Sequence, residues 1–458
     1  MKEILGVRRL GFAAAFIAAT MLAGCRGLTT GNGPNQGIKS INHIIFLVQE
    51  NRGFDHYFGK LNDYRTANGL PADVDGLPAN ASNPSFDGTT LVKSFHMQSM
   101  CVENLSPSWN EAHFDWNRFN PTSPTPTLDG FVFTAGHDAR DNVPPMHDIQ
   151  GIRAMGYYDA SDLPFYYYMA SNFATSDRWF SPLMSRTQAN RMYLLAATSA
   201  GHVYPLQGAP PLTNKTIFQL LDENGISWKI YFTDFPPLAG ESTTDMFAFF
   251  QKHQDRLVPI SQYFTDVAKG QLPQVAMIDP GFTSGRDEHP AVDPNTPIGN
   301  VQAGASYVAS VVNALMGSIS WNDTVFILTY DEDGGFYDHV APQPAVNPDG
   351  IPPSDLMPGD VCQGGTGANC DFNSTGFRVP LIVISPFTKP NYVSHTVMDY
   401  TAILKLIETR FNLPSLTKRD AAQPDMTEFF DFVNAPWIVP PFPPDQPTTG
   451  ACYLDRLP

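Results

Sequence analysis

Residues 324–340, TVFILTYDEDGGFYDHV, decide the fold. The stretch opens with TVFILT, in which every side chain is apolar or β-branched. An unbroken run of this kind predicts a strand buried on both faces of a parallel sheet, because solvent on one face would require alternating polar residues. We therefore expect an α/β fold with a mostly parallel central sheet and helices on both faces.

This strand is predicted to end at Asp331, Glu332 and Asp333, which two glycines follow. Carboxylates at the end of a buried strand cost several kcal/mol unless a positive group lies among them. In open α/β sheets the C-terminal ends of strands are also where ligands bind. A divalent cation satisfies both conditions. The alternative is a solvated turn, since Asp and Gly are common turn residues.

Residues 43–59, HIIFLVQENRGFDHYFG, repeat the same design. The apolar run IIFLV predicts a second buried strand, and Gln49, Glu50 and Asn51 come at its end. Two strands that both end in carboxylate or amide oxygens indicate a shared, oxygen-rich metal site.

The pair ENRGFDHYFG and YDEDGGFYDHV resembles the bacterial phosphoesterase family of phospholipases C and acid phosphatases, a branch of the alkaline-phosphatase-like fold. The resemblance covers most of residues 41–432. It implies an alkaline-phosphatase-like domain with long loop insertions and one divalent metal ion, which could be Mg, Ca, Mn or Zn. Together with the site chemistry it implies the ligand set Glu50, Asn51, Asp331, Glu332 and Thr187.

Residues 185–191, SRTQANR, carry the predicted nucleophile. The family motif here is Thr or Ser, any residue, then Pro-Asn-Arg, with the hydroxyl residue as nucleophile. Thr187 occupies that position and Ala189 replaces the proline, while Ser185 is the reserve candidate. From spacing alone, a hydroxyl just before a helix would instead be an N-cap.

Two histidines are predicted to contact the substrate together with Asn51. His289, in RDEHP, resembles the family's His-Pro element, whose histidine contacts the phosphoryl group. His113, in SWNEAHFDWNRF, resembles a segment that carries two histidines in the family, and the other aligns near Pro107. The resemblance makes both catalytic candidates. As bare residues, His289 would be a surface-loop residue and His113 a structural one.

Further residues are predicted to support the ligands without binding the metal. Asp333 and the pair Asp338-His339 belong to this set. Gly53 stands where the family usually has Ser, which we interpret as the loss of a supporting hydroxyl.

Residues 1–24 predict a lipoprotein signal peptide. Lys2, Arg8 and Arg9 precede an apolar segment too short to span a bilayer, and LAGC resembles the bacterial lipobox in which Cys25 receives a lipid. An ordinary signal peptide with a chance cysteine is the alternative. Residues 25–40 would form a flexible tether and residues 41–458 the catalytic domain. The protein is thus predicted to be exported and lipid-anchored to the bacterial cell envelope, periplasmic or at the cell surface.

Composition limits the partners. With 42% hydrophobic and 12% aromatic residues the chain is not disordered, and 41 Pro with 35 Gly predict long ordered loops such as residues 60–108. A net charge of −17 argues against nucleic acid and against electrostatic docking on anionic lipid. The charge does not exclude a zwitterionic phospholipid, and the resemblance implies a phospholipid or a small phosphate ester as substrate.

The four cysteines after Cys25 predict disulfides, as expected of an exported chain. Cys362 and Cys370 bracket a short Gly-rich segment and form the expected local pair, which leaves Cys101 with Cys452. Elsewhere the periodicity predicts helices over 164–173, 190–198, 216–224, 304–316 and 398–411, and strands over 227–232, 274–279 and 378–386.

Three functions compete. The first is a phospholipase C-type phosphodiesterase that acts through a phosphothreonyl intermediate. The second is an acid phosphatase, a phosphomonoesterase, at the same site. The third is a non-catalytic surface-binding lipoprotein with the same fold, which the changes at Pro107 and Ala189 would support. The complete set of metal-ligand candidates argues against the third.

Overall fold

The computed structural model describes residues 37–237, 242–365 and 367–457, and two parallel strands form its centre. β1 (His43–Gln49) and β11 (Thr324–Tyr330) pair in register, from His43 opposite Thr324 to Gln49 opposite Tyr330. Every residue of β11, and every residue of β1 except His43, is buried. The two apolar runs are therefore strands covered on both faces, as predicted.

The central sheet is mostly parallel. Its eight strands lie in the order β13-β6-β12-β11-β1-β10-β8-β9. β12 runs antiparallel to both of its neighbours, and every other pairing in the sheet is parallel. The remaining members are β6 (Ala174–Ser176), β8 (Trp228–Phe232), β9 (Leu257–Pro259), β10 (Val275–Asp279), β12 (Leu381–Ile384) and β13 (Tyr392–Ser394).

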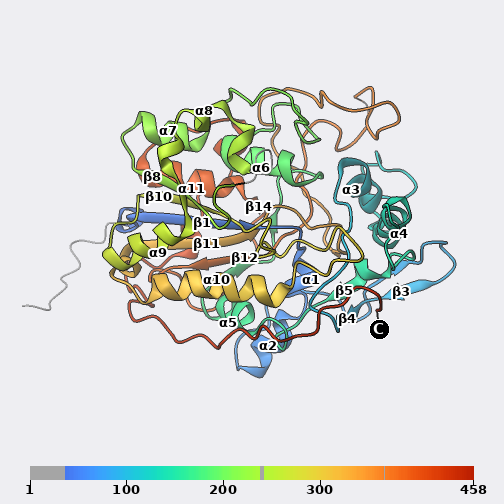
Figure 1. Cartoon of the computed structure of the whole chain (residues 1–458), viewed down its shortest axis with the longest axis horizontal. Coiled ribbons are helices and arrows are strands. Elements are labelled where there is room, and N and C mark those ends of the chain that lie inside the picture. The colour runs from blue at the N-terminus through green and yellow to red at the C-terminus, as the bar shows by residue number, and fades with distance from the viewer. Residues whose placement is uncertain (1–36, 238–241, 366, 458) are drawn as a thin grey trace, which may run out of the picture.

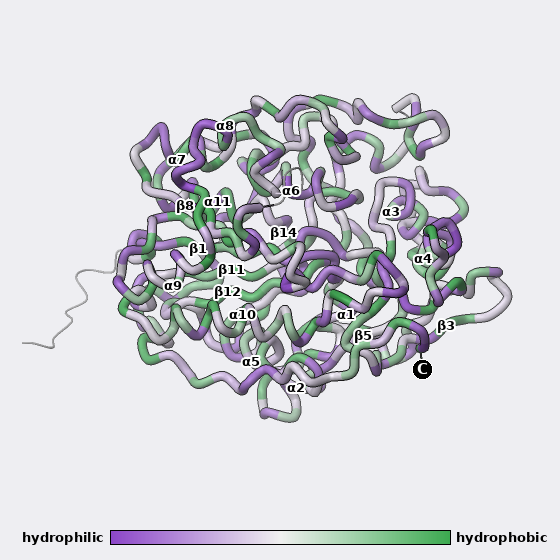
Figure 2. The backbone as a smooth tube through the Cα atoms, in the orientation of Figure 1, coloured by the Kyte–Doolittle hydropathy of each residue, from purple (hydrophilic) through white to green (hydrophobic). Residues whose placement is uncertain are grey.

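Helices cover both faces of this sheet, which confirms the predicted α/β class (Figure 1). One group comprises α6 (Thr187–Ala196), α7 (Ile217–Glu223) and α11 (Thr401–Phe411), and the other α5 (Pro164–Asn172), α9 (Ile260–Lys269) and α10 (Val301–Met316). Figure 2 shows the strands between them as the most hydrophobic part of the backbone. The apolar side chains of strands and helices thus bury one another.

Smaller elements connect and flank the main strands and helices. Residues 60–108, predicted as a loop, contain a helix and three short strands. These elements are α1 (Phe54–Phe58), α2 (Leu61–Ala67), β2 (Ser82–Pro84), β3 (Leu91–Lys93), β4 (Phe95–His96), α3 (Trp109–Trp116), α4 (Phe131–Asp141) and β5 (Gly156–Tyr157). The others are β7 (Trp179–Phe180), β14 (Met398–Asp399), α8 (Ala248–Gln251), α12 (Lys418–Ala421) and the 3₁₀ helices η1 (Gly37–Ser40), η2 (Ile152–Met155), η3 (Thr243–Met246), η4 (Gln254–Arg256), η5 (Ile319–Asp323) and η6 (Thr427–Phe429).

Three predicted boundaries are wrong for local reasons. The helix expected from residue 190 begins at Thr187, because the extended backbone ends at Arg186. The helix expected from residue 398 begins at Thr401, because β14 pairs with β7 and Asp399 accepts the Thr401 N–H over 2.8 Å. The strand expected over 378–386 covers only Leu381–Ile384, since prolines without an N–H flank it on both sides.

Both predicted disulfides, Cys101–Cys452 and Cys362–Cys370, are present. The first attaches the Pro-rich tail, which runs beneath α10 and α5 in Figure 1, to the segment before α3. Within the described residues, no helix is long and apolar enough to cross a membrane. The predicted signal peptide and Cys25 lie outside the described residues, as does the predicted tether apart from η1.

Candidate active site

Three buried carboxylates meet where β1 and β11 end. Glu50 follows β1, while Asp331 and Glu332 follow β11, and the register of the two strands brings them out at the same edge. One oxygen of each lies within 4.8 Å of the others. The backbone N–H groups of Asn51 and Glu332 donate to Oδ1 of Asp331 over 3.0 and 2.9 Å, which fixes that carboxylate. The cluster is therefore built by strand pairing.

Glycine at position 334 allows the two turns that carry these acids to touch. Gly334 has a φ of 71°, and a Cβ there would lie 2.3 Å from the Asn51 carbonyl oxygen. Asn51 itself has a φ of 55°, a value that asparagine tolerates better than most residues. Gly53 lies against the same loop, where its Cβ would be 3.3 Å from the Asp333 carbonyl oxygen. A side chain at position 53 would thus contact Asp333.

Thr187 is the first residue of α6, and its hydroxyl faces the carboxylates. The oxygen Oγ1 lies 3.0 Å from Oε1 of Glu332, to which it donates, and 3.4 Å from Oε2 of Glu50. The N-cap position is Arg186, so the hydroxyl of Thr187 does not cap the helix. The structure thus brings the predicted nucleophile and the predicted acidic ligands together.

Ser185 points elsewhere. Its side chain is buried, and Oγ donates to the carbonyl oxygen of Val203. Asn190 holds the turn around it, since the Asn190 amide accepts from the Leu183 N–H and donates to the Leu183 and Ser185 carbonyl oxygens. The two hydroxyls of the SRTQANR segment therefore have different surroundings.

Arg191, which the sequence analysis did not assign, lies behind the carboxylates. It donates to Oε1 of Glu50 over 2.5 Å and to Oδ2 of Asp331 over 3.2 Å, and Asp279 at the end of β10 lies 3.9 Å away. Burial alone would lower the pKa of Arg191, but these carboxylates outweigh it and raise the pKa. The arginine of the family motif was the signal that could have identified it.

One guanidinium does not balance the acidic cluster. Burial, followed by the charge of Asp331, raises the pKa of both Glu50 and Glu332 well above the ordinary glutamate value. Oε2 of Glu332 is buried and has no hydrogen-bond partner among the described residues. A buried carboxylate oxygen without a donor is costly. A hard divalent cation would supply the missing charge to this oxygen-rich donor set.

Asn51 and His289 are in contact beside the acidic cluster. Nδ1 of His289 lies 2.6 Å from the Pro290 carbonyl oxygen, and burial lowers the pKa of the ring. The neutral ring therefore carries its proton on Nδ1, and Nε2 is an acceptor. Nε2 lies 3.2 Å from the end of the Asn51 amide. With the amide nitrogen on that side, the amide oxygen faces Glu50 and Glu332, as a ligand of a shared cation would. With the amide turned over, its nitrogen instead donates to Glu332 over 2.8 Å and to Glu50 over 3.3 Å.

His289 is held in place by its neighbour Glu288, a second residue the sequence analysis did not assign. The Arg52 side chain donates twice to the Glu288 carbonyl oxygen, over 2.9 and 2.5 Å. The buried carboxylate of Glu288 accepts from three tyrosine hydroxyls over 2.5 to 2.8 Å, those of Tyr57, Tyr166 and Tyr330. These bonds fix the backbone from which the His289 ring projects.

A cavity of about 130 Å³ opens over this cluster. Thr187, Glu332, Asn51 and His289 all line it. Its other walls come from the loop before α3, from α4 and from the N-cap of α6, namely Asn104, Leu105, Ser106, Pro107, Ser108, Asp138 and Arg186. Pro107, near which the second family histidine aligns, is therefore a cavity residue that has no imidazole to offer.

His113 is not part of this cavity. It is fully buried in α3, where Nδ1 lies 2.6 Å from the Trp109 carbonyl oxygen and Nε2 lies 3.2 Å from that of Asn369. Burial also lowers the pKa of its ring. The structure therefore separates His113 from the other predicted catalytic residues.

The expected supporting residues form their own network. Asp338 accepts from Arg378 over 2.9 Å, and Arg378 also donates to Asp55 in α1 over 3.0 Å. His339 contacts the other oxygen of Asp55 through Nδ1 over 2.6 Å. This network ties the segment after β11 to the segment after β1. Asp333 is buried beside it, and burial raises its pKa to about 7.

Comparison with known proteins agrees with these features. The chain matches the Phosphoesterase family over residues 41–414. It is 30% identical to phospholipase C B of Mycobacterium tuberculosis over 466 residues, which covers 93% of this chain and 84% of that protein. It is 31% identical to non-specific phospholipase C4 of Arabidopsis thaliana over 418 residues, covering 84% of this chain and 71% of that protein.

Among solved structures, the chain resembles a protein in the alkaline phosphatase superfamily from Vibrio parahaemolyticus. The TM-score is 0.37 at 13% identity, and the alignment covers 80% of this chain and 78% of that one.

Proposed function

Since the chain belongs to the Phosphoesterase family and is a hydrolase of phosphoric esters, we propose that it is a metal-dependent phosphodiesterase of the phospholipase C type with Thr187 as nucleophile. The observation that carries this proposal is the position of the Thr187 hydroxyl, 3.0 Å from Glu332 and in the same cavity as His289. Its expected substrates are phospholipids, because relatives that align over most of their length carry the name phospholipase C.

A divalent ion would be held by Glu50, Asn51, Asp331 and Glu332, with the Thr187 oxygen as a further ligand. When bound, it would neutralise phosphate charge and favour the ionised form of the ligated hydroxyl. The buried, unpartnered oxygen of Glu332 supports this set. Oxygen donors of this kind suit Mg, Ca or Mn and tolerate Zn.

The protein's own groups account for the chemical steps. The Thr187 oxygen attacks phosphorus while its proton leaves toward the carboxylate that already accepts its hydrogen bond. The bond from phosphorus to the glycerol oxygen breaks, diacylglycerol leaves, and a phosphothreonyl intermediate carries the head group. Water then attacks the same phosphorus, which releases the phosphorylated head group and restores the threonine.

Two further features would stabilise the transferring phosphoryl group. The first N–H groups of α6 have no intrahelical partner, and the positive end of the helix dipole favours an anion beside Thr187. A bound phosphate would raise the pKa of His289 and favour a proton on Nε2, which would then give up the Asn51 amide N–H and donate to the substrate instead. That proton can pass to the leaving oxygen.

The decisive experiment measures hydrolysis of a phosphocholine diester and of a simple phosphomonoester by the purified protein, with and without chelator. The proposal requires chelator-sensitive cleavage of the diester with release of the phosphorylated head group. Faster cleavage of the monoester would instead support an acid phosphatase. No cleavage of either ester with any of the four metals would support a lipoprotein that only binds.

A further inference from the structure

A cleft between α3 and α4 lies next to the catalytic cavity. It encloses about 320 Å³, and its walls are largely aromatic, from Phe114, Phe119 and Phe133, with Glu111, Arg118, Thr134 and His137 completing them. We call this feature the α3–α4 cleft. The two helices are joined by the Thr134 hydroxyl, which donates to Asp115 over 2.7 Å. The cleft is therefore a feature of two packed helices.

The cleft and the catalytic cavity use the same two helices. Ser108 lines the cavity and Glu111, one helical turn further along α3, lines the cleft. In α4 the neighbours Asp138 and His137 line the cavity and the cleft respectively. One helical turn spans about 5.4 Å. The cleft and the catalytic cavity are thus lined by residues about one turn apart on α3 and adjacent on α4.

Arginines and exposed aromatic rings form the rim. The guanidinium of Arg118 lies 4.1 Å above the Phe133 ring and 5.2 Å from that of Phe119, whose side chain is 81% exposed. Arg140 lies 3.6 Å above Phe86, which stacks on Phe133. Each guanidinium donates to a backbone carbonyl oxygen, Arg118 to Phe86 over 3.1 Å and Arg140 to Gly136 over 2.7 Å, and neither has an ion pair with a carboxylate among the described residues. The charges of these two arginines are therefore not neutralised by a carboxylate in direct contact, and their remaining N–H groups can donate to an external anion.

We propose that the α3–α4 cleft and its rim are the surface that contacts a phospholipid bilayer, with the cleft receiving the hydrocarbon next to the scissile ester. Apolar walls would bury hydrocarbon, and rim arginines would contact lipid phosphates while their stems cover the aromatic rings. This inference rests on the proposed phospholipase C function. It specifies the substrate as a lipid presented at a membrane surface.

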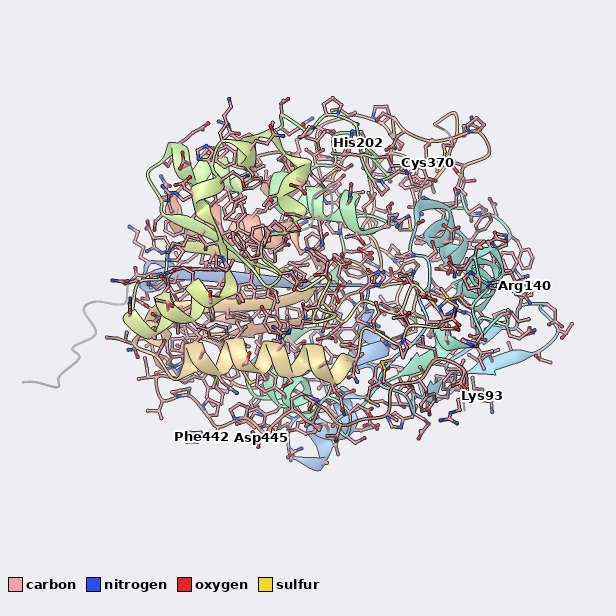
Figure 3. The ribbon with its side chains drawn as sticks, viewed as in Figure 1. Lys93, Arg140, His202, Cys370, Phe442 and Asp445 are labelled. Carbon is pink, nitrogen blue, oxygen red and sulfur yellow. A yellow bond between two sulfur atoms is a disulfide. The ribbon has the colours of Figure 1, made fainter. Side chains whose placement is uncertain are left out.

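Phe119 is the residue to change, because its exposed side chain contributes little to the folded core. Phe119→Ala and Phe119→Asp are compared with Phe442→Ala, which removes a 96% exposed phenylalanine of the tail. Figure 3 shows Arg140 beside α4 at one end of the molecule and Phe442 toward the other end. The control therefore removes a similar side chain away from the cleft.

The measured quantity is the rate on phosphatidylcholine vesicles divided by the rate on soluble p-nitrophenyl phosphocholine. We expect this ratio to fall about tenfold for Phe119→Ala, and further for Phe119→Asp, while Phe442→Ala leaves it unchanged. An unchanged ratio in both Phe119 variants, or an equal fall in Phe442→Ala, would overturn the proposal.

Vesicle flotation separates this proposal from the proposed function. In a Cys25→Ser background, which cannot receive the predicted lipid, the otherwise wild-type protein should float with phosphatidylcholine vesicles and Phe119→Asp should not, whether or not either ester is cleaved. If the wild type cleaves neither ester but the flotation difference holds, the docking surface stands and the phospholipase C function fails. Equal flotation of wild type and Phe119→Asp overturns the docking surface.

Discussion

The hydroxyl of Thr187 donates to Oε1 of Glu332 over 3.0 Å, although 145 residues separate the two in the sequence. Thr187 is the first residue of α6, and Glu332 follows the end of β11. In the structure as it stands, the Thr187 hydroxyl oxygen already lies at the edge of the acidic cluster. Such a hydroxyl can act as a nucleophile in a reaction that needs an activated oxygen.

Thr187→Ala should lower kcat on a soluble diester by several orders of magnitude, as deletion of a catalytic nucleophile does. Ser185→Ala is the matched control, because that hydroxyl donates to Val203 and is absent from the cavity lining. Acid quenching during turnover and peptide mapping by mass spectrometry should find phosphate on Thr187. Label on Ser185, or normal turnover by Thr187→Ala, would refute the mechanism.

Asp331→Asn should abolish metal binding, because carboxylate charge is the main attraction for a hard cation. Metal content after dialysis, measured by mass spectrometry, checks this outcome. Asp159→Asn, in the partly exposed His96–Asp159–Asp162 cluster, is the control and should keep full metal content. Stoichiometric metal in Asp331→Asn would show that the acidic cluster is not the metal site.

His289→Gln should affect substrates according to their leaving groups. An alkoxide leaving group needs a proton, whereas p-nitrophenolate does not. General acid catalysis typically accelerates a reaction by roughly 10²–10⁴-fold. We expect kcat to fall within that range for a diacylglycerol ester and by less than tenfold for a p-nitrophenyl ester. Equal losses on both substrates would assign His289 to phosphoryl binding instead of proton donation.

Glu408→Gln should flatten the pH dependence of stability. Burial, followed by the hydrogen bond and charge of Asp420, raises the pKa of Glu408 to about 9 from an ordinary value of 4.5. Between these values the folded state keeps a proton that the unfolded state releases, so the free energy of unfolding decreases as pH rises. The Glu408→Gln variant has no proton to release at this position, so its free energy of unfolding does not decrease for this reason. Its urea midpoint should exceed that of the wild type at pH 8 and approach it at pH 5.

Asp445→Asn, an exposed change in the tail, is the control for this experiment and should follow the wild type at both pH values. If the urea midpoint of the wild type, compared with that of Glu408→Gln, does not decrease when the pH rises from 5 to 8, the predicted uptake of a proton on folding is contradicted.

The central strands and the residues at their ends could be predicted from the sequence because each signal is local. An unbroken apolar run marks a buried strand, and the acids that follow it must lie at the sheet edge. The run at residues 381–384 predicted burial equally well, but it carries no information on direction, and β12 is antiparallel. Direction depends on the connecting chain and not on the strand itself.

The residues that support the site could not be predicted in this way. Arg191 meets Glu50 across 141 positions, and Tyr57 meets Glu288 across 231. An arginine or a tyrosine in an apolar stretch gives no indication of its distant partner. His113 is the opposite case, a residue that the sequence motif assigned to the site but that does not line the cavity. Its motif indicated a catalytic role, whereas the backbone carbonyl oxygens of Trp109 and Asn369 occupy the surroundings of its ring.

The position of β1 in the sheet has a consequence for biogenesis. β1 lies near the start of the described chain, yet its two neighbours, β10 and β11, begin at residues 275 and 324. A chain that emerges from its N-terminus must carry this apolar strand with both edges unpaired until β10 has been made, about 60% along the sequence, and with one edge unpaired until β11 follows, past two thirds of it. Unpaired strands of this kind favour aggregation. Newly made protein should therefore depend on a chaperone that covers β1 until β11 has been synthesised.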